Sequence, residues 1–146
     1  MCSASTNVQV YLSRTHGLVA EFGLRSAAAA VTLATTPGDV NRNALPAADA
    51  ASRLYAEING RLNRILSAEQ GDPAATLGAA RQLVGQVKEE AARLSPALAG
   101  TVARSLQPGL DQLIADAGQL QGDIDLAADR IAFGAWLCQS DPTFPS

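Results

Sequence analysis

The sequence predicts an all-α protein, an antiparallel up-down four-helix bundle, on three observations. Alanine and leucine, both strong helix formers, dominate the 146 residues. Aromatic residues make up only 4% of the chain, whereas a β-sandwich of this size would carry many more aromatic and β-branched residues. Apolar residues recur at alternating spacings of three and four, the pattern of helices that pack nearly parallel to one another.

The chain length indicates one domain, residues 1–146, large enough to fold without a metal or a dense set of disulfides. We expect a short polar tether at residues 1–6. We also expect a non-helical tail at residues 139–146, because Pro142 cannot continue a helix. The predicted bundle lies between these two segments.

The first predicted helix precedes a turn signal at residues 35–39, which contains Pro37-Gly38. Residues 8–12 alternate like a β-strand, but the chain offers no second strand, so we predict a helix there too. Whether this helix begins before or after Gly17 stays open. Its clearest apolar stripe is Leu18, Phe22, Ala29 and Leu33.

The second predicted helix has Pro46 in its first turn, a position that suits proline. It ends before Gly71-Asp72-Pro73, where Gly71 closes one helix, Asp72 caps the next, and Pro73 occupies the first turn of that next helix. Its apolar stripe is Ala51, Leu54, Ile58, Leu62 and Ile65.

The third and fourth helices have the most regular stripes. The third stripe is Leu77, Ala80, Val84, Val87, Ala91, Leu94 and Leu98. The fourth is Leu110, Leu113, Ala117, Leu120, Ile124, Ala127, Ile131, Gly134 and Cys138. We expect close helix approach at the small residues Gly78, Gly85, Gly118 and Gly122.

The boundary between these two helices has two candidate positions. A turn at Gln107-Pro108-Gly109, with a kink at Pro96, gives four helices of roughly 30, 25, 34 and 30 residues, about 40 to 50 Å each. These matched lengths favour the turn at residues 107–109. If Ser95-Pro96 ends a helix instead, the alternative is a five-helix array with a short segment at residues 96–106.

The two cysteines bear on the compartment. With an even number of helices, Cys2 and Cys138 lie at the same end of the bundle and can form a disulfide. Closing so long a loop would stabilise the fold by about 4 to 5 kcal/mol in the chain-entropy model, and it requires an oxidising compartment. The alternative is that Cys138 is a small core residue and Cys2 a free thiol.

The residues Met1-Cys2-Ser3-Ala4-Ser5-Thr6-Asn7 resemble the start of a mature bacterial lipoprotein, with a methionine in place of the signal peptide. This resemblance implies that Cys2 is lipidated, which would tether the protein to a membrane and prevent a bridge to Cys138. It implies a location in the periplasm or outer cell envelope. A cytoplasmic location is the alternative, because no signal peptide is visible.

Charge and motifs argue against several functions. The net charge is −3, and neither the part before Gly71 nor the part after it is a basic patch, so we expect no nucleic-acid partner. No apolar run reaches the roughly 20 residues of a transmembrane helix. The lone His16 is expected to face solvent, without a nucleophile to activate. We therefore predict no catalytic residue, cofactor or metal, and no enzyme.

Two features remain as candidates. The acidic run Asp111, Asp116, Asp123, Asp125 and Asp129 is interpreted as a solvated helix face, with Asp125 or Asp129 pairing with Arg130 or a neighbouring helix. Phe133 and Trp136 lie off the fourth stripe. They are either core at a second interface, the interpretation that the usual burial of tryptophan favours, or a contact patch for a partner.

The predicted function is that of a non-enzymatic helical bundle of the bacterial cell envelope, acting through contacts with an unidentified protein partner. The alternative is a carrier or sensor that binds an apolar small molecule between its helices.

Overall fold

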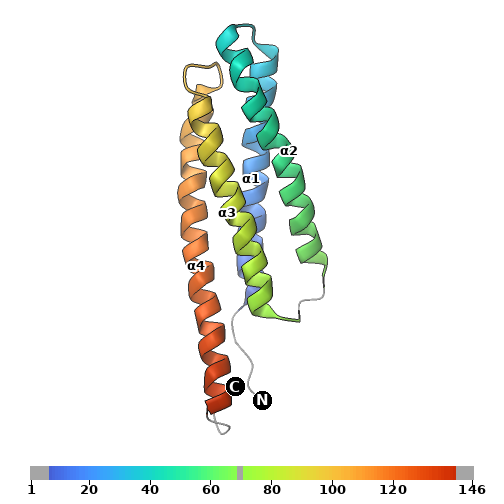
Figure 1. Ribbon diagram of the computed structural model, residues 1–146, viewed down its shortest axis with the longest axis vertical. Coiled ribbons are helices and arrows are strands. Elements are labelled where there is room, and N and C mark those ends of the chain that lie inside the picture. Colours follow the sequence, from blue (N-terminus) through green and yellow to red (C-terminus); the bar gives the residue numbers. More distant parts are fainter. Residues whose placement is uncertain (1–6, 69–70, 141–146) are drawn as a thin grey trace.

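The computed structural model describes residues 7–68 and 71–140 and contains four long helices (Figure 1). They are α1 (Val8–Thr35), α2 (Asp39–Ser67), α3 (Pro73–Ala97) and α4 (Gln107–Ser140), with a short 3₁₀ helix, η1 (Arg104–Leu106), before α4. The all-α, up-down four-helix prediction is confirmed. α1 begins at Val8, so the strand-like start is helical and the first helix begins before Gly17.

The helices pack as two antiparallel hairpins, α1 with α2 and α3 with α4, and these pairs form the most extensive interfaces. α1 and α3 also pack against each other, and each of them contacts all three other helices (Figure 1). The core therefore surrounds the α1–α3 contact, with α2 and α4 closing it from outside.

The predicted apolar stripes form this core. Every member of the first and third stripes is buried, and so are the members of the fourth stripe from Leu110 to Ala127. In the second stripe Leu54 and Ile65 are half-buried. Burial of one face of each helix is what holds these long helices together, because isolated helices are only marginally stable in water.

Side chains cap two of the helices as their types require. The Asn7 Oδ1 accepts a hydrogen bond of 3.1 Å from the backbone N–H of Gln9 at the start of α1. The Asp72 Oδ1 accepts one of 3.1 Å from Ala74, and Pro73 is the first residue of α3. These bonds satisfy backbone donors that have no partner within the helix. The predicted roles of Asp72 and Pro73 are confirmed.

Three boundary predictions are wrong. α2 begins at Asp39, so Pro46 lies inside the helix rather than in its first turn. α2 ends at Ser67, so Gly71 does not close it. α4 continues to Ser140, so Gln139 and Ser140 are helical rather than part of a tail. The predicted tether at residues 1–6 and the rest of the predicted tail, residues 141–146, lie outside the described residues.

The turn between α3 and α4 also differs from the prediction. α3 ends at Ala97, directly after Pro96, and the chain reverses through residues 98–106, while Pro108 and Gly109 lie in the first turn of α4. Proline removes one helical hydrogen bond, and Gly100, at φ 72°, adopts the left-handed conformation that ends a helix. Residues 96–106 do not form a fifth helix, so the number of long helices stays even.

One buried amide joins the two loops at this end of the bundle. The Asn41 Oδ1 accepts a hydrogen bond of 3.0 Å from the backbone N–H of Val102, in the α3–α4 loop. Its Nδ2 donates to the carbonyl of Pro37, in the α1–α2 loop, over 3.1 Å. Asn41 thereby fixes both loops to the start of α2.

Close helix approach occurs mainly at glycines other than those predicted. A methyl group at Gly23 on α1 would overlap the ring of Tyr55 on α2, and one at Gly109 on α4 would overlap the Arg25 guanidinium. Gly85 and Gly118 approach only the side chains of Gln121 and Lys88. Gly78 and Gly122 have open space beside them, so the prediction of close contact is wrong there.

Candidate functional site

Three residues of the acidic run on α4, Asp111, Asp123 and Asp125, have partners on neighbouring helices. Asp123 pairs with Arg14 of α1 over 2.8 Å. Asp125 accepts two hydrogen bonds from Arg81 of α3, at 2.6 and 3.1 Å. The predicted pairing of Asp125 with a neighbouring helix is confirmed. Two further members of the run bind uncharged side chains. Asp111 accepts a hydrogen bond from Ser95 of α3 over 2.7 Å, and Asp116 accepts one from Gln112 of α4 itself over 2.9 Å.

The forked Arg81–Asp125 pair has a specific electrostatic effect. The hydrogen bond from Arg81 to Asp125, together with the negative charge of Asp125, raises the pKa of the Arg81 guanidinium above its ordinary value. Both side chains are about half exposed, so water screens the pair and it joins α3 to α4 only weakly. The Arg81–Asp125 pair has a structural role, because the two side chains bind each other.

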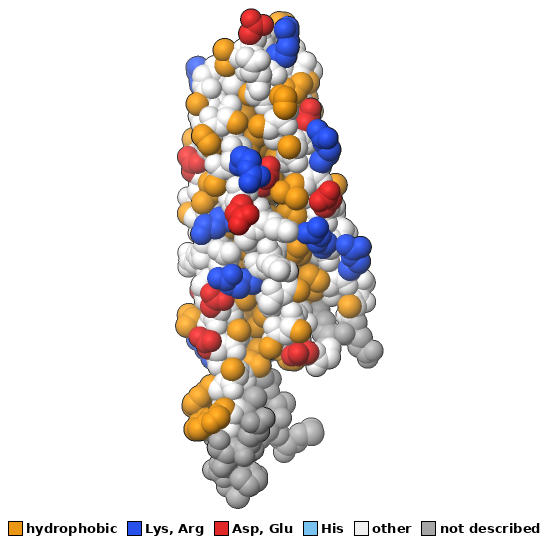
Figure 2. All heavy atoms as spheres, viewed as in Figure 1, with side chains coloured by type: hydrophobic (Ala, Val, Ile, Leu, Met, Phe, Trp, Pro, Cys, Tyr) orange, Lys and Arg blue, Asp and Glu red, His pale blue; other side chains and the backbone are white. Residues whose placement is uncertain are grey.

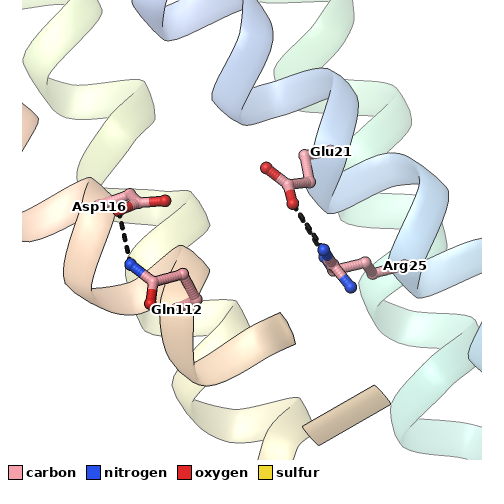
Figure 3. A network of polar contacts seen from close by, with 4 residues as sticks. All are labelled: Glu21, Arg25, Gln112 and Asp116. Carbon is pink, nitrogen blue, oxygen red and sulfur yellow. Dashed lines mark hydrogen bonds and ion pairs between the residues drawn. The ribbon is translucent and has the colours of Figure 1, made fainter. Parts of the chain in front are cut away.

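A solvent-open hollow of about 340 Å³ lies between α1 and α4. Glu21 of α1 and Asp116 of α4 line it, and Figure 3 shows them with their partners Arg25 and Gln112 facing across the gap. A similar open hollow between α2 and α3 is lined by Arg53, Glu57, Glu90 and Arg93. Sites for apolar ligands are enclosed and mostly apolar, so these charged hollows give the carrier alternative no support.

Metal-binding groups do not converge in the part of the chain that the structure describes. Within residues 7–68 and 71–140, no group of three or more His, Cys, Asp or Glu residues can hold a metal ion. His16 is exposed on α1, as predicted. Ser26 and Ser52 have buried hydroxyl groups without a hydrogen-bond partner.

The end of α4 projects beyond the rest of the bundle (Figure 1). The contacts of Ser95 with Asp111, Lys88 with Gly118, and Arg81 with Asp125 step evenly along the antiparallel α3–α4 pair. The same register places Pro73, the first residue of α3, level with Phe133. Residues 134–140 therefore run past the end of α3. We call residues 131–140 the overhang.

Phe133 and Trp136 lie exposed on this overhang, at 60% and 57% of their surface. Their rings stack with centroids 6.0 Å apart. Figure 2 shows hydrophobic side chains gathered at this end, past the last charged groups visible on that face. The favoured interpretation of these two residues as core is wrong, because α3 begins only at the level of Phe133 and does not reach Trp136. The contact-patch alternative stays a prediction.

A second exposed apolar surface lies on α1. Leu24 and Val31 are exposed at 73% and 62%, with the exposed Ala27 and Ala28 between them. We call these four residues the α1 stripe. Among the described helices, α1 is long and apolar enough to cross a membrane by length and composition alone, but its opposite face forms core with residues such as Phe22. The expectation of no transmembrane helix stays a prediction.

The two cysteines give no further geometry. Cys2 lies outside the described residues, and so does the side chain of Cys138, although its backbone belongs to α4. The start of α1 and the end of α4 lie at the same end of the bundle (Figure 1), which satisfies the topological condition for the predicted disulfide. Both the disulfide and the lipidation of Cys2 stay predictions.

Sequence reasoning missed the α1 stripe and the loop-joining Asn41. An uncharged stretch from Ser26 to Gly38 was available as a signal for the stripe, but it equally fits a buried helix. No protein-family model, curated protein or solved structure matches the chain.

Proposed function

We propose that this chain is a non-enzymatic helical bundle of the bacterial cell envelope, anchored through Cys2, that acts by contact with another protein. The observation that carries the proposal is the α1 stripe, with two large aliphatic side chains exposed and no charge between Ser26 and Gly38. Exposed apolar patches on soluble proteins mark interaction sites. The ion pairs Arg14–Asp123 and Arg81–Asp125 support the same view, since their charged groups bind each other, and the described residues hold no group that could bind a metal ion.

Photo-crosslinking in cells tests the protein contact. A photoreactive phenylalanine analogue replaces Ala28, in the middle of the α1 stripe, and the matched control carries the same analogue at Arg53, an exposed position on α2. We expect a discrete cross-linked product from position 28 and none from position 53. Equal labelling from both positions, or no product from position 28, would contradict a partner on this face.

The anchor is tested separately by intact-mass measurement of the protein isolated from the membranes of the cells that make it. We expect acyl chains on Cys2, as the lipoprotein-like start implies. An unmodified Cys2 thiol, or a Cys2–Cys138 disulfide, would remove the anchor from the proposal but would leave the contact through the α1 stripe to be decided by cross-linking.

A further inference from the structure

The overhang of α4 differs from every other helix end in the described structure. The sequence from Ile131 to Ser140 carries no charged residue, although Arg130 directly precedes it and Asp141 directly follows it. Its two large aromatic rings are exposed. α1 does not extend to this level, and α3 reaches only as far as Phe133. Helices that are apolar on most of their surface are normally buried, either in a protein core or in a membrane.

We propose that the overhang inserts into the interfacial layer of a lipid bilayer. Tryptophan and other aromatic residues concentrate at this layer, where the ring is buried and its polar edge stays hydrated. Ten residues of helix are about 15 Å long, too short to cross the roughly 30 Å hydrocarbon core but long enough to reach the interfacial depth of about 5 to 10 Å. The charged residues that flank the uncharged segment, Arg130 and Asp141, would then stay in the hydrated headgroup region.

The position of α1 connects this insertion with the proposed anchor. Because Arg14 of α1 pairs with Asp123 of the antiparallel α4, Val8 lies level with about Asp129, beside the base of the overhang. Cys2 precedes Val8 by six residues, which span at most about 20 Å when extended. An acyl chain on Cys2 and the overhang can therefore enter the same leaflet.

The physics of lipid anchoring explains why both contacts would be needed. A single acyl chain holds a protein only marginally, and stable attachment takes a second signal. A polybasic patch often supplies that signal, but this end of the chain has no cluster of basic residues. The aromatic rings take that role here. This step depends on the proposed lipid anchor, whereas insertion of the overhang does not.

Trp136 is the only tryptophan in the chain, so its fluorescence reports directly on the overhang. The protein is held on phosphatidylcholine vesicles by an N-terminal hexahistidine tag and a nickel-chelating lipid, which replaces the acyl anchor. We expect a blue shift of Trp136 emission, quenching by doxyl-labelled lipid, and protection from iodide. These effects should persist in high salt and without anionic lipid, because no charge contributes to insertion.

Two aspartate substitutions on α4 form a matched pair. Phe133→Asp places a charge on the overhang and should abolish the blue shift and the quenching by doxyl-labelled lipid. Leu126→Asp places the same charge on a side chain that is 57% exposed but lies within the bundle, and should leave both effects in place. Circular dichroism establishes that both variants are folded.

Three results would overturn the proposal: unchanged Trp136 emission when the tethered protein is on vesicles, protection of Trp136 from iodide before vesicles are added, or equal loss of signal in both variants. Concentration-dependent dimers in sedimentation, without a response to vesicles, would assign the overhang to a second copy. A protein partner cross-linked from position 133, again without a vesicle response, would assign it to protein. Because the tag replaces the acyl chain, failure of the Cys2 anchor cannot produce any of these results.

Discussion

The four-helix section of the molecule buries most of its large apolar side chains, whereas the overhang of α4 exposes its two aromatic rings. In the four-helix section Phe22 is fully buried between helices, and the loops at its closed end are joined by Asn41. In the overhang Phe133 and Trp136 stay exposed, and beyond Phe133 α4 continues past the end of α3. The same helix, α4, contributes to both regions. The difference teaches that α4 is longer than the fold of the bundle requires.

The largest expected difference between the two regions is in the cost of deleting a phenylalanine ring. Phe22→Ala should lower the free energy of unfolding by about 3 to 5 kcal/mol, because it leaves a cavity in the core. Phe133→Ala should cost less than about 1 kcal/mol, since most of its side-chain surface is exposed and its ring stacks on the exposed Trp136. Chemical denaturation in the absence of lipid measures both. Similar costs for the two variants would mean that the overhang is packed in solution.

A smaller effect on the free energy of unfolding is expected at the end of the bundle that holds the α1–α2 and α3–α4 loops. Asn41→Ala should lower the free energy of unfolding by about 1 to 3 kcal/mol, because the Val102 N–H and the Pro37 carbonyl lose their side-chain partner. Asn43→Ala, at an exposed position two residues further along α2, is the control and should be neutral or slightly stabilising. Thermal unfolding compares the two variants. Equal behaviour would show that the loops hold their positions without Asn41.

The smallest effect concerns the Arg81–Asp125 pair, which lies near the boundary between the two regions. Asp125 raises the pKa of Arg81, so wherever Asp125 is ionised the pair stabilises the folded state at pH values below the unfolded-state pKa of arginine, and this stabilisation is lost as the pH rises through the folded value. From about pH 6 to about pH 9 we therefore expect Arg81→Gln to lower the melting temperature slightly and by a constant amount.

Salt and a neighbouring charge supply the controls for this variant. The difference between Arg81→Gln and the unsubstituted protein should shrink in high salt, because both side chains are about half exposed. Arg130→Gln removes the same charge from an exposed position at the base of the overhang and should change the melting temperature less. If the decrease in melting temperature caused by Arg81→Gln changed steeply across this pH range, another titrating group would determine the effect of the substitution.

The sequence was sufficient to predict the bundle, because the spacing of residues such as Leu77, Val84 and Leu120 specifies one buried face of each helix. It was not sufficient to place the α3–α4 turn. Both Pro96 and Pro108-Gly109 are turn signals, and the assumption of equal helix lengths selected the wrong one. The matched lengths extended the third predicted helix through Pro96 to the second signal, whereas α3 ends at Ala97 and α4, longer than its neighbours, begins at Gln107.

The exposure of Phe133 and Trp136 could not be predicted for a related reason. A tryptophan is usually well buried, and whether a neighbouring helix reaches it depends on the register between α3 and α4. That register depends on which residues of α3 lie beside which residues of α4, such as Lys88 beside Gly118. The spacing of apolar residues within one helix does not specify this pairing. The role of Asn41 depends in the same way on two loops far apart in the sequence.

The two-hairpin arrangement also has a consequence for how fast the chain folds. The most extensive interfaces, α1 with α2 and α3 with α4, join helices that follow one another directly, so most of the contacts formed in folding are short in sequence separation. Proteins rich in such local contacts fold in microseconds to milliseconds. Each hairpin can then form early. Packing of α1 against α3, which joins the two hairpins, would be the late step of folding.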